Sequence, residues 1–190
     1  MPIWGWVIIG VAIVVALGAA IFAMATRRRT QRLRSQFGPE YDRTVADTPS
    51  KREAEHVLAE REKRRSEYDI KPLTPAARDR YASAWRDTQA RFVDDPGSAV
   101  AEADRLIERV MAERGYPVED FEAQAGDLSV DHPDVVQDYR EAHSIAVRHA
   151  RGGADTEDLR RALVRYRALF ERLLVTEDQR TERAPEPSGV

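Results

Sequence analysis

Residues 3–25 form an uncharged run of 23 residues, and this run constrains the fold more than any other feature of the chain. As an α-helix it would extend about 34 Å, at roughly 1.5 Å per residue. The hydrocarbon core of a bilayer is roughly 30 Å thick, so a helix of this length spans it with modest tilt. We therefore expect a transmembrane anchor over residues 1–26.

The residues that flank this run predict its orientation. Five arginines follow at once, and no acidic residue appears before Glu40; they are Arg27, Arg28, Arg29, Arg32 and Arg34. A spanning helix leaves its cationic flank on the cytoplasmic side, and Trp4 and Trp6 are typical of an aromatic belt at the outer face. We expect a single-pass plasma-membrane protein with its N-terminus outside and the remaining chain in the cytoplasm. The arginines form a basic collar that would attract anionic lipid headgroups.

A cleaved signal peptide is the alternative interpretation of the same run. Ala23 and Ala25 form an A-x-A pattern of the kind that precedes cleavage sites. Against this, the front end lacks Lys and Arg, and the apolar run is longer than the 7–15 residues that are typical of signal peptides. An anchor is the better interpretation, and an exported or extracytoplasmic domain stays open.

Small residues also recur along the apolar run. Ala12, Ala16 and Ala20 are spaced every fourth residue, which lets two spanning helices approach closely. Ordinary membrane-helix composition explains the same pattern, because short motifs of this kind are common. Self-association is therefore a secondary hypothesis.

Charge is divided unevenly along the remaining chain, and this bears on partners. Residues 26–71 hold 13 Lys and Arg against 9 Asp and Glu, whereas residues 72–190 carry a net charge of −7. An acidic distal domain is repelled by nucleic acid, so we expect no nucleic-acid partner. The chain contains no cysteine, which excludes disulfides, thiol nucleophiles and thiolate metal sites.

Helix-breaking residues divide the polar part of the chain. Residues 27–50 read as a basic juxtamembrane linker with a short helix after the Gly38-Pro39 break. Residues 51–71 read as a charged stem helix, with a start signal at Asp47-Thr48-Pro49. Because the stem has few apolar positions and no sustained heptad, we expect a solvated helix that docks weakly or bridges to the membrane.

Residues 72–175 show the periodicity of a helical bundle. Start and stop signals stand at Thr74-Pro75, Asp95-Pro96, Gly115, Asp131-His132-Pro133 and Asp155-Thr156. Apolar stripes at helical spacing run between these signals, and strand alternation of useful length is absent. We predict an all-α protein: a transmembrane helix, a stem helix and a small antiparallel bundle, followed by a disordered tail over residues 176–190.

Several phrases of the sequence resemble a known family. They are LRSQFGPEYDRTV, ARFVDDPGSAVAEADRLIERVM, RGYPVEDFE, DLSVDHPDVVQDYREAH and YRALFERLL. Together they resemble a family of uncharacterised bacterial proteins that are labelled "secreted protein" or hypothetical membrane protein because of an N-terminal apolar segment. The resemblance implies no activity, and its "secreted" label implies the export that the arginine collar argues against.

The stretch 127–134 is the most suggestive of chemistry. Asp127, Asp131, His132 and Asp134 place three carboxylates and an imidazole within eight residues, a donor set that suits a hard or borderline metal ion. The competing interpretation is a helix start, with Asp131 or His132 as the cap and Pro133 in the first turn. His143, on an apolar stripe, is a further candidate ligand or a packed imidazole.

No catalytic motif accompanies these residues. The sequence lacks a glycine-rich phosphate loop, a nucleophile elbow and a zinc-binding histidine pair. We expect neither an enzyme nor a cofactor. The leading hypothesis is a membrane-tethered module that binds another protein; the alternative is a small-ligand or metal-binding domain that uses the 127–134 loop and His143.

Overall fold

The computed structural model describes the backbone of residues 3–118 and 120–175, with the side chains of these residues except those of residues 3, 5–9 and 11. Within this part of the chain the regular structure consists of eight α-helices, with no strand, which confirms the all-α class. The chain divides into two compact units, Met1–Ala59 and Glu60–Val190.

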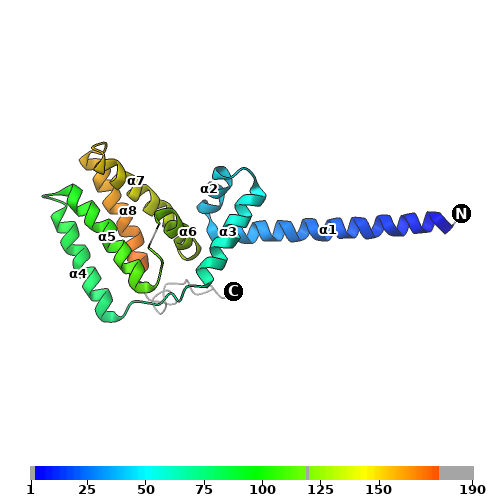
Figure 1. Ribbon diagram of the computed structural model, residues 1–190, viewed down its shortest axis with the longest axis horizontal. Coiled ribbons are helices and arrows are strands. Elements are labelled where there is room, and N and C mark those ends of the chain that lie inside the picture. Colours follow the sequence, from blue (N-terminus) through cyan, green and yellow to red (C-terminus); the bar gives the residue numbers. More distant parts are fainter. Residues whose placement is uncertain (1–2, 119, 176–190) are drawn as a thin grey trace, which may run out of the picture. The chain divides into compact units, whose positions relative to one another are not determined.

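The first unit contains α1 (Ile3–Phe37), α2 (Pro39–Asp47) and the beginning of α3 (Lys51–Ser66). The predicted break between the first two helices is confirmed, because Gly38 adopts a φ of 49° that non-glycine residues avoid and Pro39 opens α2. The two shorter helices fold back beside the C-terminal part of α1, while its N-terminal part extends away from them (Figure 1). Each helix contributes buried apolar side chains: Leu33, Phe37, Tyr41, Ala54 and Leu58.

The expected anchor occupies the N-terminal part of α1. Its described large apolar side chains are exposed: Trp4, Ile13, Val14, Val15, Leu17, Ile21, Phe22 and Met24. Among the residues whose side chains are described, no helix combines the length and the apolar character that a membrane span requires. The side chain of Trp6 and the expected disordered tail, residues 176–190, lie outside the described part of the chain.

The stem helix begins at Lys51, two residues after the predicted start signal at Asp47–Pro49, and ends at Ser66. Thr48 is extended and ends α2, because a residue that precedes proline is driven away from helical geometry. The helix begins at Lys51 instead, where the Ser50 hydroxyl accepts a hydrogen bond from the Glu53 N–H at 3.2 Å. Ala54 and Leu58 are fully buried, so α3 packs more closely than its charged sequence indicates.

The second unit is the predicted helical bundle. It contains α4 (Pro75–Arg91), α5 (Pro96–Arg114), α6 (Phe121–Asp131), α7 (Val136–Ala150) and α8 (Thr156–Leu174). Short connections make hairpins of α4 with α5 and of α7 with α8, and α5 packs against α8 to join them (Figure 1). The predicted caps are confirmed at three helix starts, where the side chains of Thr74, Asp95 and Asp155 accept backbone hydrogen bonds.

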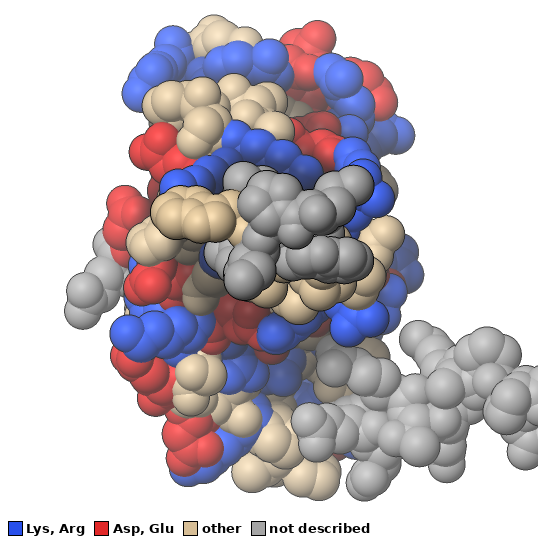
Figure 2. All heavy atoms as spheres, turned by 90° about the vertical axis from the view of Figure 1, so that its right-hand side faces the viewer, with Lys and Arg blue, Asp and Glu red and all other residues tan. Residues whose placement is uncertain are grey.

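Aromatic side chains fill the centre of the bundle. Trp85 of α4 stacks on Phe170 of α8 with ring centroids 4.5 Å apart. Tyr139 and Tyr166 are fully buried, and burial raises the pKa of both phenols well above the usual value. Acidic and basic side chains are intermixed on the face of the molecule that Figure 2 shows.

The expectation of a loop over residues 127–134 is wrong, because α6 continues through Asp131 and ends at His132. Asp120 caps α6, and Gly126, a residue type that often ends a helix, lies in its interior. A Cβ added at Gly126 would approach the Arg61 side chain to 3.1 Å, so the glycine provides room for Arg61 without ending the helix. Neither Asp131 nor His132 caps α7, whose N-cap is Val135.

Candidate functional site

Asp127, the first of the predicted ligand residues, lies on α6 and is held by an arginine. Arg64 donates to its Oδ1 from Nε at 2.9 Å and from Nη2 at 2.7 Å. The Asp127 side chain is 1% exposed, so the interactions that water would otherwise provide to this carboxylate come from Arg64 and from a hydrogen bond with Tyr68. The hydrogen bond to Asp127 in turn raises the pKa of Arg64.

Asp131 and His132 are brought together at one small cavity of about 90 Å³ at the end of α6. Asp131 accepts hydrogen bonds from the Tyr116 hydroxyl and from Nε of Arg65. Burial, with the Asp131 hydrogen bond in second place, raises the pKa of Tyr116 well above the usual range. Both hydrogen bonds end on Oδ2 of Asp131, so this carboxylate belongs to an ion-pair and hydrogen-bond network within the second unit.

Asp134 and His143 lie elsewhere in the bundle. Asp134 forms an ion pair with Arg172 of α8. His143 stacks on Phe121 with ring centroids 3.7 Å apart, and its Nδ1 lies 3.5 Å from the Asp104 carboxylate. Over the residues that the structure describes, no three His, Cys, Asp or Glu side chains are placed to hold a metal ion together.

Two arginines of the predicted basic collar contact other helices of the first unit, because α2 and α3 fold back beside α1. Arg34 forms an exposed ion pair with Asp42 of α2 at 2.8 Å. Arg29 donates from Nη2 to the backbone carbonyl of Glu55 at 3.5 Å. The collar is therefore one wall of a structure built from three helices and not an isolated run of charges.

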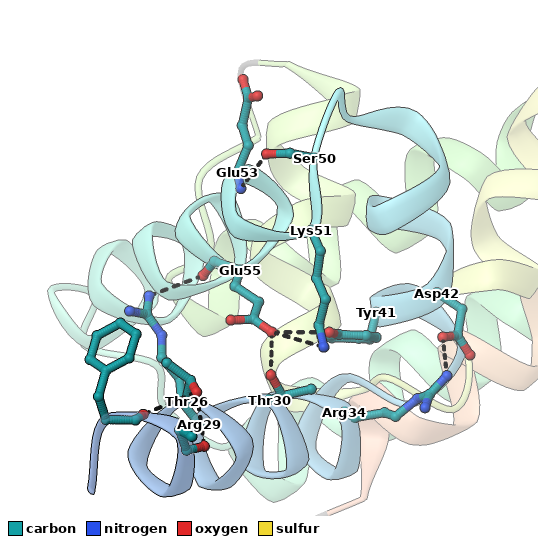
Figure 3. Close-up of polar contacts among 12 residues, drawn as sticks. Thr26, Arg29, Thr30, Arg34, Tyr41, Asp42, Ser50, Lys51, Glu53 and Glu55 are labelled. Atoms are coloured by element: carbon teal, nitrogen blue, oxygen red, sulfur yellow. Dashed lines mark hydrogen bonds and ion pairs between the residues drawn. The ribbon is translucent and has the colours of Figure 1, made fainter. Parts of the chain in front are cut away.

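Glu55 of α3 is the polar centre of this structure, as Figure 3 shows. Its Oε1 accepts hydrogen bonds from the Thr30 hydroxyl of α1 at 2.6 Å and from the Tyr41 hydroxyl of α2 at 3.1 Å. Nζ of Lys51 lies 3.9 Å from the same oxygen. Burial, together with the hydrogen bond to Glu55, raises the pKa of Tyr41. One carboxylate thus ties the first turn of α3 to both preceding helices.

A groove runs between α1 and α3 on this side of the first unit, with a volume of about 730 Å³. The residues that line it are Phe22, Thr26, Arg27, Arg29, Thr30, Gln31, Lys51, Arg52 and Glu55. Four of these carry positive charge and one carries negative charge. We call this set the α1–α3 groove.

Sequence reasoning found the α1 side of this groove and missed the α3 side. Lys51 and Arg52 lie 17 and 18 residues beyond Arg34, the last arginine of the collar, and nothing in their local sequence places them beside it. The Gly38-Pro39 break and Pro49 indicate that the chain changes direction. They do not say which turn of α3 will meet which turn of α1, because packing sets that register.

Comparisons of the chain with family models, with curated proteins and with solved structures found no match.

Proposed function

We propose that the chain is a single-pass membrane protein, anchored by residues 3–25, whose helical bundle binds a protein partner in the cytoplasm. The observation that best supports a membrane anchor is the exposure of apolar side chains around the N-terminal part of α1. Ile13, Val14 and Val15 are consecutive and are 54%, 69% and 64% exposed. Consecutive residues of a helix point about 100° apart, so no single face of this helix is polar.

Exposure of this kind favours a lipid environment. A helix that is apolar all round is stable only within a larger protein core or a bilayer. The uncharged run is long enough for the bilayer, and a cluster of arginines follows it directly. The arginine collar supports an orientation with the bundle in the cytoplasm, and its charge supports contact with anionic lipid headgroups.

Topology fusions test this proposal directly. A fluorescent protein at the C-terminus should fluoresce, and alkaline phosphatase at the same position should be inactive, because the former folds in the cytoplasm and the latter outside it. The uncleaved chain should remain in the membrane pellet after extraction with alkaline carbonate. Phosphatase activity would instead support the exported alternative, and release by carbonate would refute the anchor.

A surface groove between α4 and α8 supports the interaction role of the bundle. Its floor contains Trp85, Phe170 and Leu174, and its edge carries Arg86 and Arg172. An apolar centre with a charged rim is the usual anatomy of a protein interface. The ligand-binding alternative has less support, since Asp127, Asp131 and Asp134 are each paired with a different arginine.

Site-specific crosslinking tests the interaction role in cells. A photoreactive residue in place of Arg86, at the groove, should give a reproducible adduct with one protein. The matched control replaces Arg105, an exposed arginine of α5 that does not line the groove. Adducts of equal intensity at both positions, or none at either, would contradict a docking role for this surface.

A further inference from the structure

The α1–α3 groove lies where the uncharged run of α1 gives way to the arginine collar. Phe22 belongs to the run and is 71% exposed, while Thr26 and Arg27 stand about one helical turn further on. If residues 3–25 occupy the bilayer, as the proposed function requires, the groove spans the boundary between acyl chains and phosphates. Its position along α1 is therefore that of a lipid headgroup.

The cations of the groove come from two helices that face each other. Arg27 and Arg29 belong to α1, and Lys51 and Arg52 belong to the first turn of α3. The hydrogen bond from Thr30 to Glu55 and the bond from Arg29 to the Glu55 carbonyl hold the two helices in this register (Figure 3). A phosphate between the helices would meet positive charge from both sides.

The acidic residue of the groove offsets one of the four positive charges and leaves three. Oε1 of Glu55 accepts hydrogen bonds from the hydroxyls of Thr30 and Tyr41 and lies 3.9 Å from Nζ of Lys51, so the groove remains positively charged overall. The remaining lining combines an apolar ring, Phe22, with hydroxyl and amide groups, Thr26 and Gln31. A phospholipid has a charged headgroup at one end and an acyl chain at the other, so an anionic phospholipid matches a groove whose lining is basic, polar and apolar.

We propose that the α1–α3 groove binds one anionic phospholipid, with the phosphate between the cations of the two helices and an acyl chain along Phe22. This inference rests on the proposed membrane anchor and goes beyond it, because a diffuse collar needs only the α1 arginines. The groove assigns a binding role to Lys51 and Arg52, which lie on a different helix.

Native mass spectrometry of the full chain can count retained lipids. The protein is purified in micelles that contain equal amounts of phosphatidylcholine and phosphatidylglycerol. The wild-type chain should retain phosphatidylglycerol preferentially, as one lipid adduct. The variant K51Q/R52Q should lower the ratio of the two adducts about 25-fold, at roughly fivefold for each basic residue near an anionic surface.

The matched control is R28Q/R32Q, which removes the same charge from α1 at positions outside the groove. A diffuse collar predicts the larger loss for this control, because its arginines are nearer to the apolar run in sequence. The groove predicts the larger loss for K51Q/R52Q. Circular dichroism checks that both variants retain the helical content of the wild type, which we expect because these side chains are exposed.

Each remaining outcome overturns a specific statement. Equal losses in the two variants, or no phosphatidylglycerol preference in a wild-type chain that stays in the membrane, would refute the groove and leave the anchor intact. Displacement of the adduct by inorganic phosphate would show a site for free anions and refute a lipid. Release of the chain by alkaline carbonate would refute the anchor itself, and the lipid site with it.

Discussion

The ion pair between Arg64 and Asp127 provides a direct test of how burial controls the stability of the bundle. We predict that Arg64→Gln destabilises the second unit by about 2 kcal/mol, whereas Arg172→Gln costs less than about 1 kcal/mol. Both arginines bind an aspartate of another segment, Asp127 on α6 and Asp134 in the connection between α6 and α7, and both pairs join a guanidinium to a carboxylate. They differ in the exposure of the carboxylate.

The expected magnitude follows from that difference. The Asp127 side chain is 1% exposed, so removal of its partner leaves a charge that water cannot reach. Loss of one partner of a fully buried pair costs about 3–5 kcal/mol, and the partial exposure of Arg64, at 44%, reduces this estimate. Asp134 and Arg172 are 48% and 51% exposed, so solvent replaces most of what their pair provides.

Trp85 offers a specific probe for this measurement. The chain has three tryptophans, and the other two, Trp4 and Trp6, lie in the first unit. In a W4F/W6F background, urea unfolding followed by fluorescence reports the environment of Trp85 alone, which is 5% exposed and stacked on Phe170. The full chain is measured in detergent, and the midpoints and slopes of the two variants are compared.

Two results would refute this reasoning. If Arg64→Gln and Arg172→Gln destabilise the chain equally, burial of the carboxylate does not decide the energetics. If R64Q/D127N is as unstable as R64Q alone, the cost does not arise from an uncompensated charge at Asp127, because the double variant removes that charge. Recovery of a substantial part of the stability in the double variant is the expected result.

Two further predictions concern backbone strain and pH. Gly115 has a φ of 97°, and an added Cβ would lie 2.7 Å from the carbonyl oxygen of Asp69, so Gly115→Ala should cost more than about 2 kcal/mol by urea unfolding. Gly152 has a φ of 76° with open space around it, so Gly152→Ala should cost only about 1 kcal/mol, and equal costs would show that the contact with Asp69 is unimportant. The Tyr81 hydroxyl donates to Glu113 at 2.6 Å and lowers the pKa of that carboxyl, so Tyr81→Phe should move this pKa back toward 4.5 in an NMR titration. A carboxyl whose pKa is lower in the folded state than in the unfolded state stabilises the fold at pH values above its unfolded-state pKa, and this stabilisation is lost as the pH falls through its folded-state pKa. The difference in stability between wild type and Tyr81→Phe should therefore shrink under acid conditions. A difference that stays constant with pH would contradict this assignment.

Local patterns predicted most helix boundaries of the bundle. Thr74-Pro75, Asp95-Pro96 and Asp155-Thr156 combine a capping oxygen with helix-compatible backbone, and each begins a helix as predicted. Where the prediction failed, a local signal competed with packing. Gly126 reads as a stop, but it lies inside α6 because the Arg61 side chain occupies the space that a Cβ would need.

The predicted ligand set failed for a related reason. Asp127, Asp131 and Asp134 are close in sequence, which suggested one site. A helix turns about 100° per residue, and the chain leaves the helix after Asp131, so these carboxylates meet arginines from different elements. Proximity in sequence predicts a shared site only where the backbone conformation is known.

The sequence by itself determined the helical class, the caps of α4, α5 and α8, and the separation of an apolar segment from a charged chain, because these depend on interactions within a few residues. Tertiary structure alone decided which distant charges meet. Lys51 and Arg52 join Arg27 and Arg29 because α3 packs against the two preceding helices, through buried side chains such as Leu33 and Leu58 and through the hydroxyls of Thr30 and Tyr41 that bind Glu55. Helix propensity acts locally, whereas a groove between helices exists only once their packing has brought separate segments together.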